Sequence, residues 1–192
     1  MQKIFVIFVA AIFTQNVALY YLLGMCPFVS LARSLKTAFG MGIAVVFVIF
    51  LTAAVNWPIY HWILEPNNAK ILKYIVFIIV IAASVQLVEM IMERFFPALQ
   101  ASFGIFLPLI TVNCTVLFVS LQVINTKLEY LQTIIYALGA AIGFWLAIVI
   151  VAAIYEKLEL IGDVPRGLKG PGIIMITTGI IALSFMGFSG MF

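Results

Sequence analysis

Charged side chains are what this sequence has least of. Asp, Glu, Lys and Arg make up only 9% of its 192 residues, and 66% of the residues are hydrophobic. Soluble domains carry about 25% charged residues, so this composition excludes a soluble enzyme and predicts an integral membrane protein. The net charge of +3 is spread along the chain, which excludes a basic patch for nucleic acid. The membrane lipid is therefore an expected partner.

The few charges are confined to narrow windows, and between them lie long apolar runs. Six charge-free runs cover residues 4–32, 37–64, 74–88, 95–126, 130–155 and 170–192. About 20 apolar residues suffice for a helix to cross a bilayer. We therefore predict an all-α integral membrane protein with six transmembrane helices in a single domain, residues 1–192. No loop between the runs is long enough to fold as a second domain.

Two of the apolar runs contain residues that break helices. The first predicted helix, residues 3–23, is followed by Gly24-Met25-Cys26-Pro27, and the fourth run holds Gly104, Pro108 and Asn113-Cys114. Non-helical backbone at membrane depth survives only where it is buried in protein or lines a cavity. The first and fourth helices are thus predicted to be discontinuous. The other four are predicted over residues 37–62, 70–94, 128–155 and 172–190.

The two halves of the chain, about 1–95 and 96–192, share one pattern. In each, a broken helix that carries a cysteine precedes a helix with a small-residue patch and then a third helix. The patches are Gly40-Met41-Gly42 and Gly139 to Gly143, which predict close helix packing. Because each half has an odd number of helices, the second half must enter from the opposite side. This predicts an inverted 3+3 repeat that brings the two breaks together at mid-depth.

Cysteine is scarce as well, and both cysteines, Cys26 and Cys114, lie at the predicted breaks. Three interpretations are open: small apolar residues, a disulfide, or ligands of a metal or cluster. Only ligation explains why unwound backbone accompanies them, because half-helix N–H groups can offset negative charge in the membrane. Iron–sulfur clusters are usually held by four thiolates. This chain offers two, so ligation would require two more from another chain.

Several motifs resemble the A-type subunit of the Rnf-type ion-translocating oxidoreductases, along essentially the whole chain. They are Leu23-Gly24-Met25-Cys26-Pro27-Phe28, Lys36-Thr37-Ala38-Phe39-Gly40-Met41-Gly42, Pro108-Leu109-Ile110-Thr111-Val112-Asn113-Cys114 and Phe185-Met186-Gly187-Phe188-Ser189-Gly190. The E-type subunit of the sodium-translocating NADH:quinone reductase is a paralogue of close similarity. Gly24-Met25-Cys26 leans toward this second type and Pro27 toward the first, so either remains a candidate.

The resemblance implies a function and a cofactor. Cys26 and Cys114 would supply half of a [2Fe–2S] cluster, shared with a paralogous E-type subunit of opposite topology. The complex would pass electrons between ferredoxin and NAD through flavins and further Fe–S clusters in other Rnf-type subunits, coupled to Na⁺ or H⁺ transport across a bacterial or archaeal cytoplasmic membrane. This chain would be one component of a translocase, with no catalytic residue and no complete active site of its own.

Polar side chains inside the apolar runs are candidates for an ion pathway. Gln86 and Glu89 are three residues apart and share a helix face, and Glu89 has Arg94 as an alternative ion-pair partner. Asn16 and Asn113 lie in the two interrupted segments. The competing function is a redox-silent transporter or channel component that uses the breaks to bind an ion or solute.

The distribution of Lys and Arg predicts the orientation. Six of these residues fall in the odd-numbered loops and four on the opposite side. By the positive-inside rule, we expect both termini outside. The cluster from Asn56 to Trp62, which includes the single histidine, His61, is typical of an interfacial aromatic belt at the level of the lipid headgroups.

Overall fold

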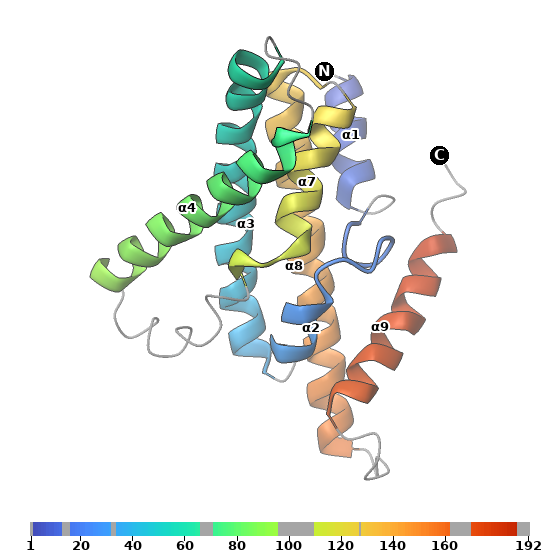
Figure 1. The fold of residues 1–192 in the computed structure, drawn as a ribbon. Helices are drawn as coiled ribbons and strands as arrows, with labels where there is room; N and C mark the ends of the chain where they lie inside the picture. Colours follow the sequence, from blue (N-terminus) through green and yellow to red (C-terminus); the bar gives the residue numbers. More distant parts are fainter. Residues whose placement is uncertain are drawn as a thin grey trace.

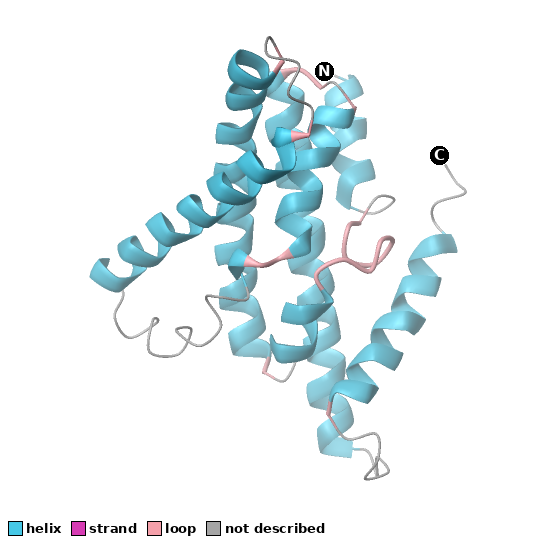
Figure 2. Ribbon diagram, viewed as in Figure 1, coloured by secondary structure: helices cyan, strands magenta, loops and turns pink. Residues whose placement is uncertain are grey.

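The computed structural model describes residues 2–12, 16–31, 34–65, 71–95, 110–126, 128–161 and 170–187. Within these ranges the chain is helical, with turns and loops between the helices and no strand (Figure 2). The helices are α1 (Gln2–Ile12), α2 (Met25–Leu31), α3 (Leu35–Ile59), which continues as the π-helix η1 (Tyr60–Leu64), α4 (Leu72–Phe95), α7 (Cys114–Asn125), α8 (Tyr130–Ile161) and α9 (Pro171–Met186). The predicted all-α class is confirmed for this part of the chain.

Three of the described helices are long and apolar enough to cross a bilayer. They are α3 with η1, α4 and α8. The helices α7 and α9 are apolar but shorter, and α1 and α2 follow one another from one end of the bundle to the other (Figure 1). A multi-pass helical membrane protein is consistent with this arrangement, and the count of six spans stays a prediction.

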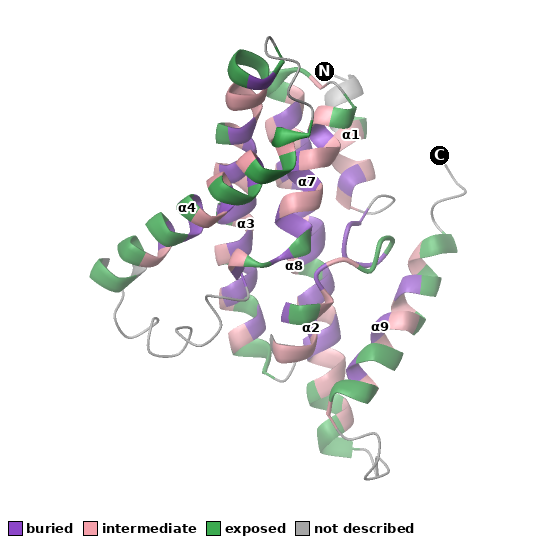
Figure 3. Cartoon of the chain, viewed as in Figure 1, coloured by how far each residue is buried: buried purple, intermediate pink, exposed green. Residues whose placement is uncertain are grey.

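Helix α8 forms the centre of the bundle and packs mainly against α3 and α1 (Figures 1 and 3). Small residues allow the close approach. Gly139 of α8 lies against Phe8 and Ala11 of α1, and Gly42 of α3 lies directly against the indole of Trp145 on α8. Without a strong hydrophobic drive between helices in lipid, such backbone proximity is a main source of association. The two predicted small-residue patches are therefore confirmed as packing surfaces.

The first predicted helix is wrong in its end point. It was expected to reach residue 23, but α1 ends at Ile12, and residues 16–24 form turns. Asn16, expected within the helix, lies in the break. Its amide donates to the Ile12 carbonyl, and its oxygen accepts from the amides of Ala18 and Leu19. Asn side chains compete with the helical backbone in this way, so the break begins about two turns earlier than glycine and proline alone indicate.

The remaining predicted helices agree with the structure apart from their ends. Helix α4 matches the prediction of 70–94, and α9 starts within a residue of its predicted start. Helix α8 continues to Ile161, six residues beyond its predicted end, because Glu156, Lys157 and Glu159 stop a membrane span but not a helix. Gly104 and Pro108, which carry most of the second predicted break, lie outside the described residues.

The directions of the described helices follow the order that an inverted repeat requires. In Figure 1, α2 runs downward, α3 upward and α4 downward, whereas α7 runs upward, α8 downward and α9 upward. Helices α2 and α7 both begin at or next to a cysteine. The repeat itself stays a prediction, since the start of its second half falls between residues 96 and 109, outside the described ranges.

Candidate functional site

The first break is held by side-chain hydrogen bonds and by glycine. Besides its local bonds, Asn16 donates through Nδ2 to the carbonyl of Gly143 on α8 at 2.9 Å. Gly24 has a φ of +80°, in the left-handed region that favours glycine. A Cβ at Gly24 would lie 2.5 Å from Thr115 Oγ1 and 2.9 Å from Phe144 Cε2. The break therefore requires glycine here for both its backbone conformation and its packing.

The second break ends in a helix cap. Asn113 is the N-cap of α7, and its Oδ1 accepts from the amide of Thr115 at 3.0 Å. This is the usual role of Asn before a helix. Cys114 is the first residue of α7, so the cap fixes the start of the helix beside the cysteine.

The structure brings the two breaks together. A side chain at Gly24 would meet Asn113 Oδ1 at 3.2 Å as well as Thr115, so the chain before α2 touches the chain at the start of α7. Figure 1 shows the first turns of α2 and α7 at the middle height of the bundle, with the two helices leaving in opposite directions. Cys26 follows Gly24 by two residues, and Cys114 lies between Asn113 and Thr115, so both cysteines belong to one region.

Both cysteines are free and exposed, whereas Pro27 beside Cys26 and Asn113 and Thr115 on either side of Cys114 are buried. Phe28, Asn113 and Thr115 are at most 3% exposed. Among the described residues, no three His, Cys, Asp or Glu side chains lie close enough to hold a metal ion. The thiols thus point out of the bundle, and any cluster that they bind needs ligands from elsewhere.

Two buried polar atoms beside the cysteines have no hydrogen-bond partner within the part of the chain that the structure describes. They are Asn113 Nδ2 and Thr115 Oγ1. An unpaired buried polar group costs about 1–3 kcal/mol. Both can donate a hydrogen bond, and donors near cluster sulfurs tune the reduction potential of an iron–sulfur site. Two thiols and two unsatisfied donors at a helix start suit half of such a site.

Gln86 and Glu89 lie on the same face of α4, as predicted from their spacing. Both line a shallow cavity of about 450 Å³ together with Glu93, and its described lining residues all belong to α4. Glu89 is half-buried and Gln86 is exposed. The structure does not bring this face to Asn16 or Asn113, because α4 diverges from the bundle toward its C-terminal end (Figures 1 and 3).

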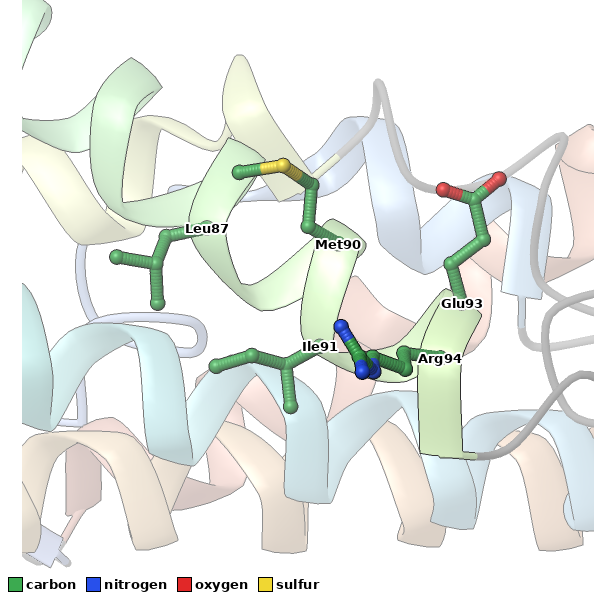
Figure 4. Close-up of a pocket in the computed structure, with 5 residues that line it drawn as sticks. All are labelled: Leu87, Met90, Ile91, Glu93 and Arg94. Atoms are coloured by element: carbon green, nitrogen blue, oxygen red, sulfur yellow. The ribbon is translucent and has the colours of Figure 1, made fainter.

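A neighbouring cavity of about 570 Å³ on α4 is lined by Leu87, Met90, Ile91, Glu93 and Arg94. Figure 4 shows that Glu93 and Arg94 point away from each other. Among the described residues, the ion pair formed is His61 with Glu65, and Glu89 is not paired with Arg94. The ion pair of Glu89 with Arg94 is thus not formed in this structure, and the role of Glu89 stays a prediction.

The similarity to known proteins runs along the whole chain. A family model described as "Rnf-Nqr subunit, membrane protein" matches residues 4–192. The chain belongs to the Rnf–Nqr family of membrane subunits. It is 44% identical to the E-type subunit of the Na⁺-translocating NADH-quinone reductase of Proteus mirabilis, with 99% of this chain and 98% of that protein covered. It is 45% identical to the A-type subunit of the Na⁺-translocating ferredoxin:NAD⁺ oxidoreductase complex of Acetobacterium woodii, with 96% of each covered.

These values confirm the predicted resemblance to the Rnf–Nqr family. The identities to the E-type and A-type subunits are nearly equal, so they do not assign the chain to either type. Both relatives are subunits of membrane oxidoreductase complexes. Two residues of the site, Thr115 and Phe144, were not singled out from the sequence, and Gly143 was predicted only as part of a small-residue packing patch. Thr115 could have been found from the sequence, because it directly follows the Asn113-Cys114 pair. The contacts of Gly143 and Phe144 with the first break could not, because they arise only from tertiary packing.

Proposed function

We propose that this chain is an electron-relay subunit of a redox-driven, ion-translocating membrane complex. Cys26 and Cys114 would supply two of the four thiolates of a [2Fe–2S] cluster, and a paralogous subunit of opposite topology would supply the others. The observation that carries the proposal is the contact of Gly24 with Asn113 and Thr115, which gathers two exposed, free thiols at the meeting point of two helix breaks.

The surroundings of the cysteines suit this role. A cluster with four thiolates carries net negative charge. The first N–H groups of α7, a 12-residue helix, carry partial positive charge beside Cys114. When bound, such a cluster accepts and donates single electrons. The residues of this chain hold its ligands at fixed positions: Asn113 by capping α7, and Gly24 by allowing the two breaks to touch.

The coupled ion is Na⁺ or H⁺ in this proposal, and Gln86, Glu89, Asn16 and Asn113 remain the predicted candidates for its path. The two relatives named above are Na⁺-translocating, which favours Na⁺. The electron donor and acceptor follow the branch of the family: ferredoxin and NAD⁺, or NADH and quinone. Measuring both reactions with the purified complex decides between them.

The test replaces the ligands one at a time. Cys26→Ser and Cys114→Ser should each lower the iron content of the purified complex and abolish its electron transfer. Val112→Ser is the matched control, because Val112 is an exposed residue at the same break, with 69% of its surface exposed. It should keep both iron and turnover. Full iron content and turnover in either Cys variant would overturn the ligand assignment and favour the redox-silent transporter.

A further inference from the structure

A second polar region lies where the ends of α3, α7 and α8 meet, away from the cysteines (Figure 1). It contains a cavity of about 280 Å³. The cavity is lined by residues from the end of α3, from η1 and its C-cap, and from the two ends of the α7–α8 connection: Trp57, Tyr60, His61, Glu65, Val123, Ile124, Leu128 and Glu129. It thus opens at one end of the bundle, and none of its lining residues belongs to the two helix breaks.

The wall of the cavity is fixed by Trp57. Its indole Nε1 donates to the carbonyl of Leu128 at 3.1 Å, and its ring stacks on His61 with centroids 5.3 Å apart. His61 Nδ1 lies 2.7 Å from Glu65 Oε2. The entrance therefore carries two carboxylates: Glu65, which contacts His61, and Glu129, which has no salt-bridge partner among the described residues.

Three buried polar residues lie one turn deeper than residues that line the cavity. Asn56 is four residues before Tyr60, and Ser120 is four before Ile124. Thr133 is four after Glu129, on a helix that runs in the opposite direction. Residues four apart share a helix face, so each helix carries a buried polar side chain one turn from the cavity, on the face that lines it. All three are at most 3% exposed.

Two oxygen atoms of this deeper layer have no hydrogen-bond partner among the described residues. Asn56 donates through Nδ2 to Ser120 Oγ at 3.1 Å, and Ser120 donates to the Val116 carbonyl at 3.0 Å. These bonds leave Asn56 Oδ1 unsatisfied, and Thr133 Oγ1 is unsatisfied as well. Other buried threonines of the chain differ from Thr133 in the hydrogen bonding of their hydroxyl groups. Thr52 and Thr178 donate to the carbonyl four residues earlier in their own helices, whereas Thr133 does not.

The chemistry of these groups selects the ligand. Amide, hydroxyl and carboxylate oxygens are hard donors, which favour hard cations over soft ones. The described side chains of the deep layer, Asn56, Ser120 and Thr133, are neutral. A divalent ion among them would keep uncompensated charge between apolar helices, at high cost. A small monovalent cation costs less and suits the two unsatisfied oxygens of this layer together with the Glu129 carboxylate at the entrance.

We propose that Glu129, Thr133 and Asn56 form a binding site for a small monovalent cation of the Na⁺ type, entered through the cavity beside Trp57. The site rests on the proposed function, to which it adds a place where the transported ion is held. It is separate from the Gln86–Glu89 face, which lies on α4 alone.

The test uses the purified complex with NaCl or choline chloride at equal ionic strength. Thr133→Val and Glu129→Gln should each raise the Na⁺ concentration for half-maximal electron transfer about tenfold, the ratio equivalent to about 1.4 kcal/mol. The Na⁺-dependent rise in melting temperature should shrink in parallel, because a ligand of the native state stabilises it by mass action. Thr178→Val, a buried threonine with a satisfied hydroxyl, should behave as wild type.

Two outcomes would overturn the site. One is a wild-type Na⁺ response in both Thr133→Val and Glu129→Gln. The other is a loss of stability in Thr133→Val that is equal in NaCl and choline chloride, with the half-saturating Na⁺ concentration unchanged, since this indicates a structural water. Iron content separates this failure from that of the proposed function: it should stay at the wild-type level in these variants, and its absence from the wild-type complex would refute the cluster instead.

Discussion

Replacing Asn16 by Leu removes the hydrogen bonds that shape the first break and keeps the side-chain volume similar. Asn16 forms three bonds of 2.9–3.1 Å, to the Ile12 carbonyl, the Gly143 carbonyl and the Ala18 amide, and a longer one of 3.4 Å to the Leu19 amide. A buried hydrogen bond contributes about 1 kcal/mol net. The three shorter bonds therefore predict a loss of about 3 kcal/mol in the free energy of unfolding.

Unfolding by SDS in mixed micelles measures this loss. Asn125→Leu is the control, because Asn125 is exposed and its side chain accepts a single bond, from Lys73 at 3.4 Å. It should change the free energy of unfolding by less than about 0.5 kcal/mol. A stability of Asn16→Leu within that margin would refute the structural role. If ion transport per electron fell at the same time, Asn16 would instead act in the ion path.

Three further predictions follow from packing, charge and topology. Gly42→Ala should destabilise the chain by about 1–3 kcal/mol through overlap with Trp145, whereas Gly179→Ala, with open space around it, should not; SDS unfolding of both variants checks this. Glu89→Gln should lower the ions moved per electron in proteoliposomes and leave the iron content unchanged, and unaltered coupling would remove Glu89 from the ion path. A periplasm-only reporter fused after Phe192 should be active, and activity of a cytoplasm-only reporter there would reverse the orientation.

The sequence predicted the meeting of the two breaks better than it predicted the helix that leads to the first of them. Cys26 and Cys114 were expected at helix breaks that meet, and the contact of Gly24 with Asn113 and Thr115 places the breaks together. Local signals sufficed, because glycine, proline and a capping asparagine mark the breaks directly. The end of α1 could not be predicted in this way, since Asn16 is bonded to Gly143, 127 residues away.

The proposed cation site could not be predicted from the sequence for a different reason. Glu129 and Thr133 are four residues apart, a spacing visible in the sequence, but neither stood out alone. Their significance depends on Asn56 and Ser120, which reach the same region from two other helices. Likewise, the shared face of Gln86 and Glu89 was predictable from spacing, whereas its separation from Asn16 and Asn113 depends on how far α4 diverges from the bundle.

The EPR spectrum of the reduced complex tests the central claim most directly, because a thiolate ligand determines the signal of the iron to which it is bound. We predict that the wild-type complex shows a [2Fe–2S] signal that is lost or shifted in Cys114→Ser and in Cys26→Ser, and unchanged in Val112→Ser. Spectra of both Cys variants identical to that of the wild type would contradict ligation by this chain.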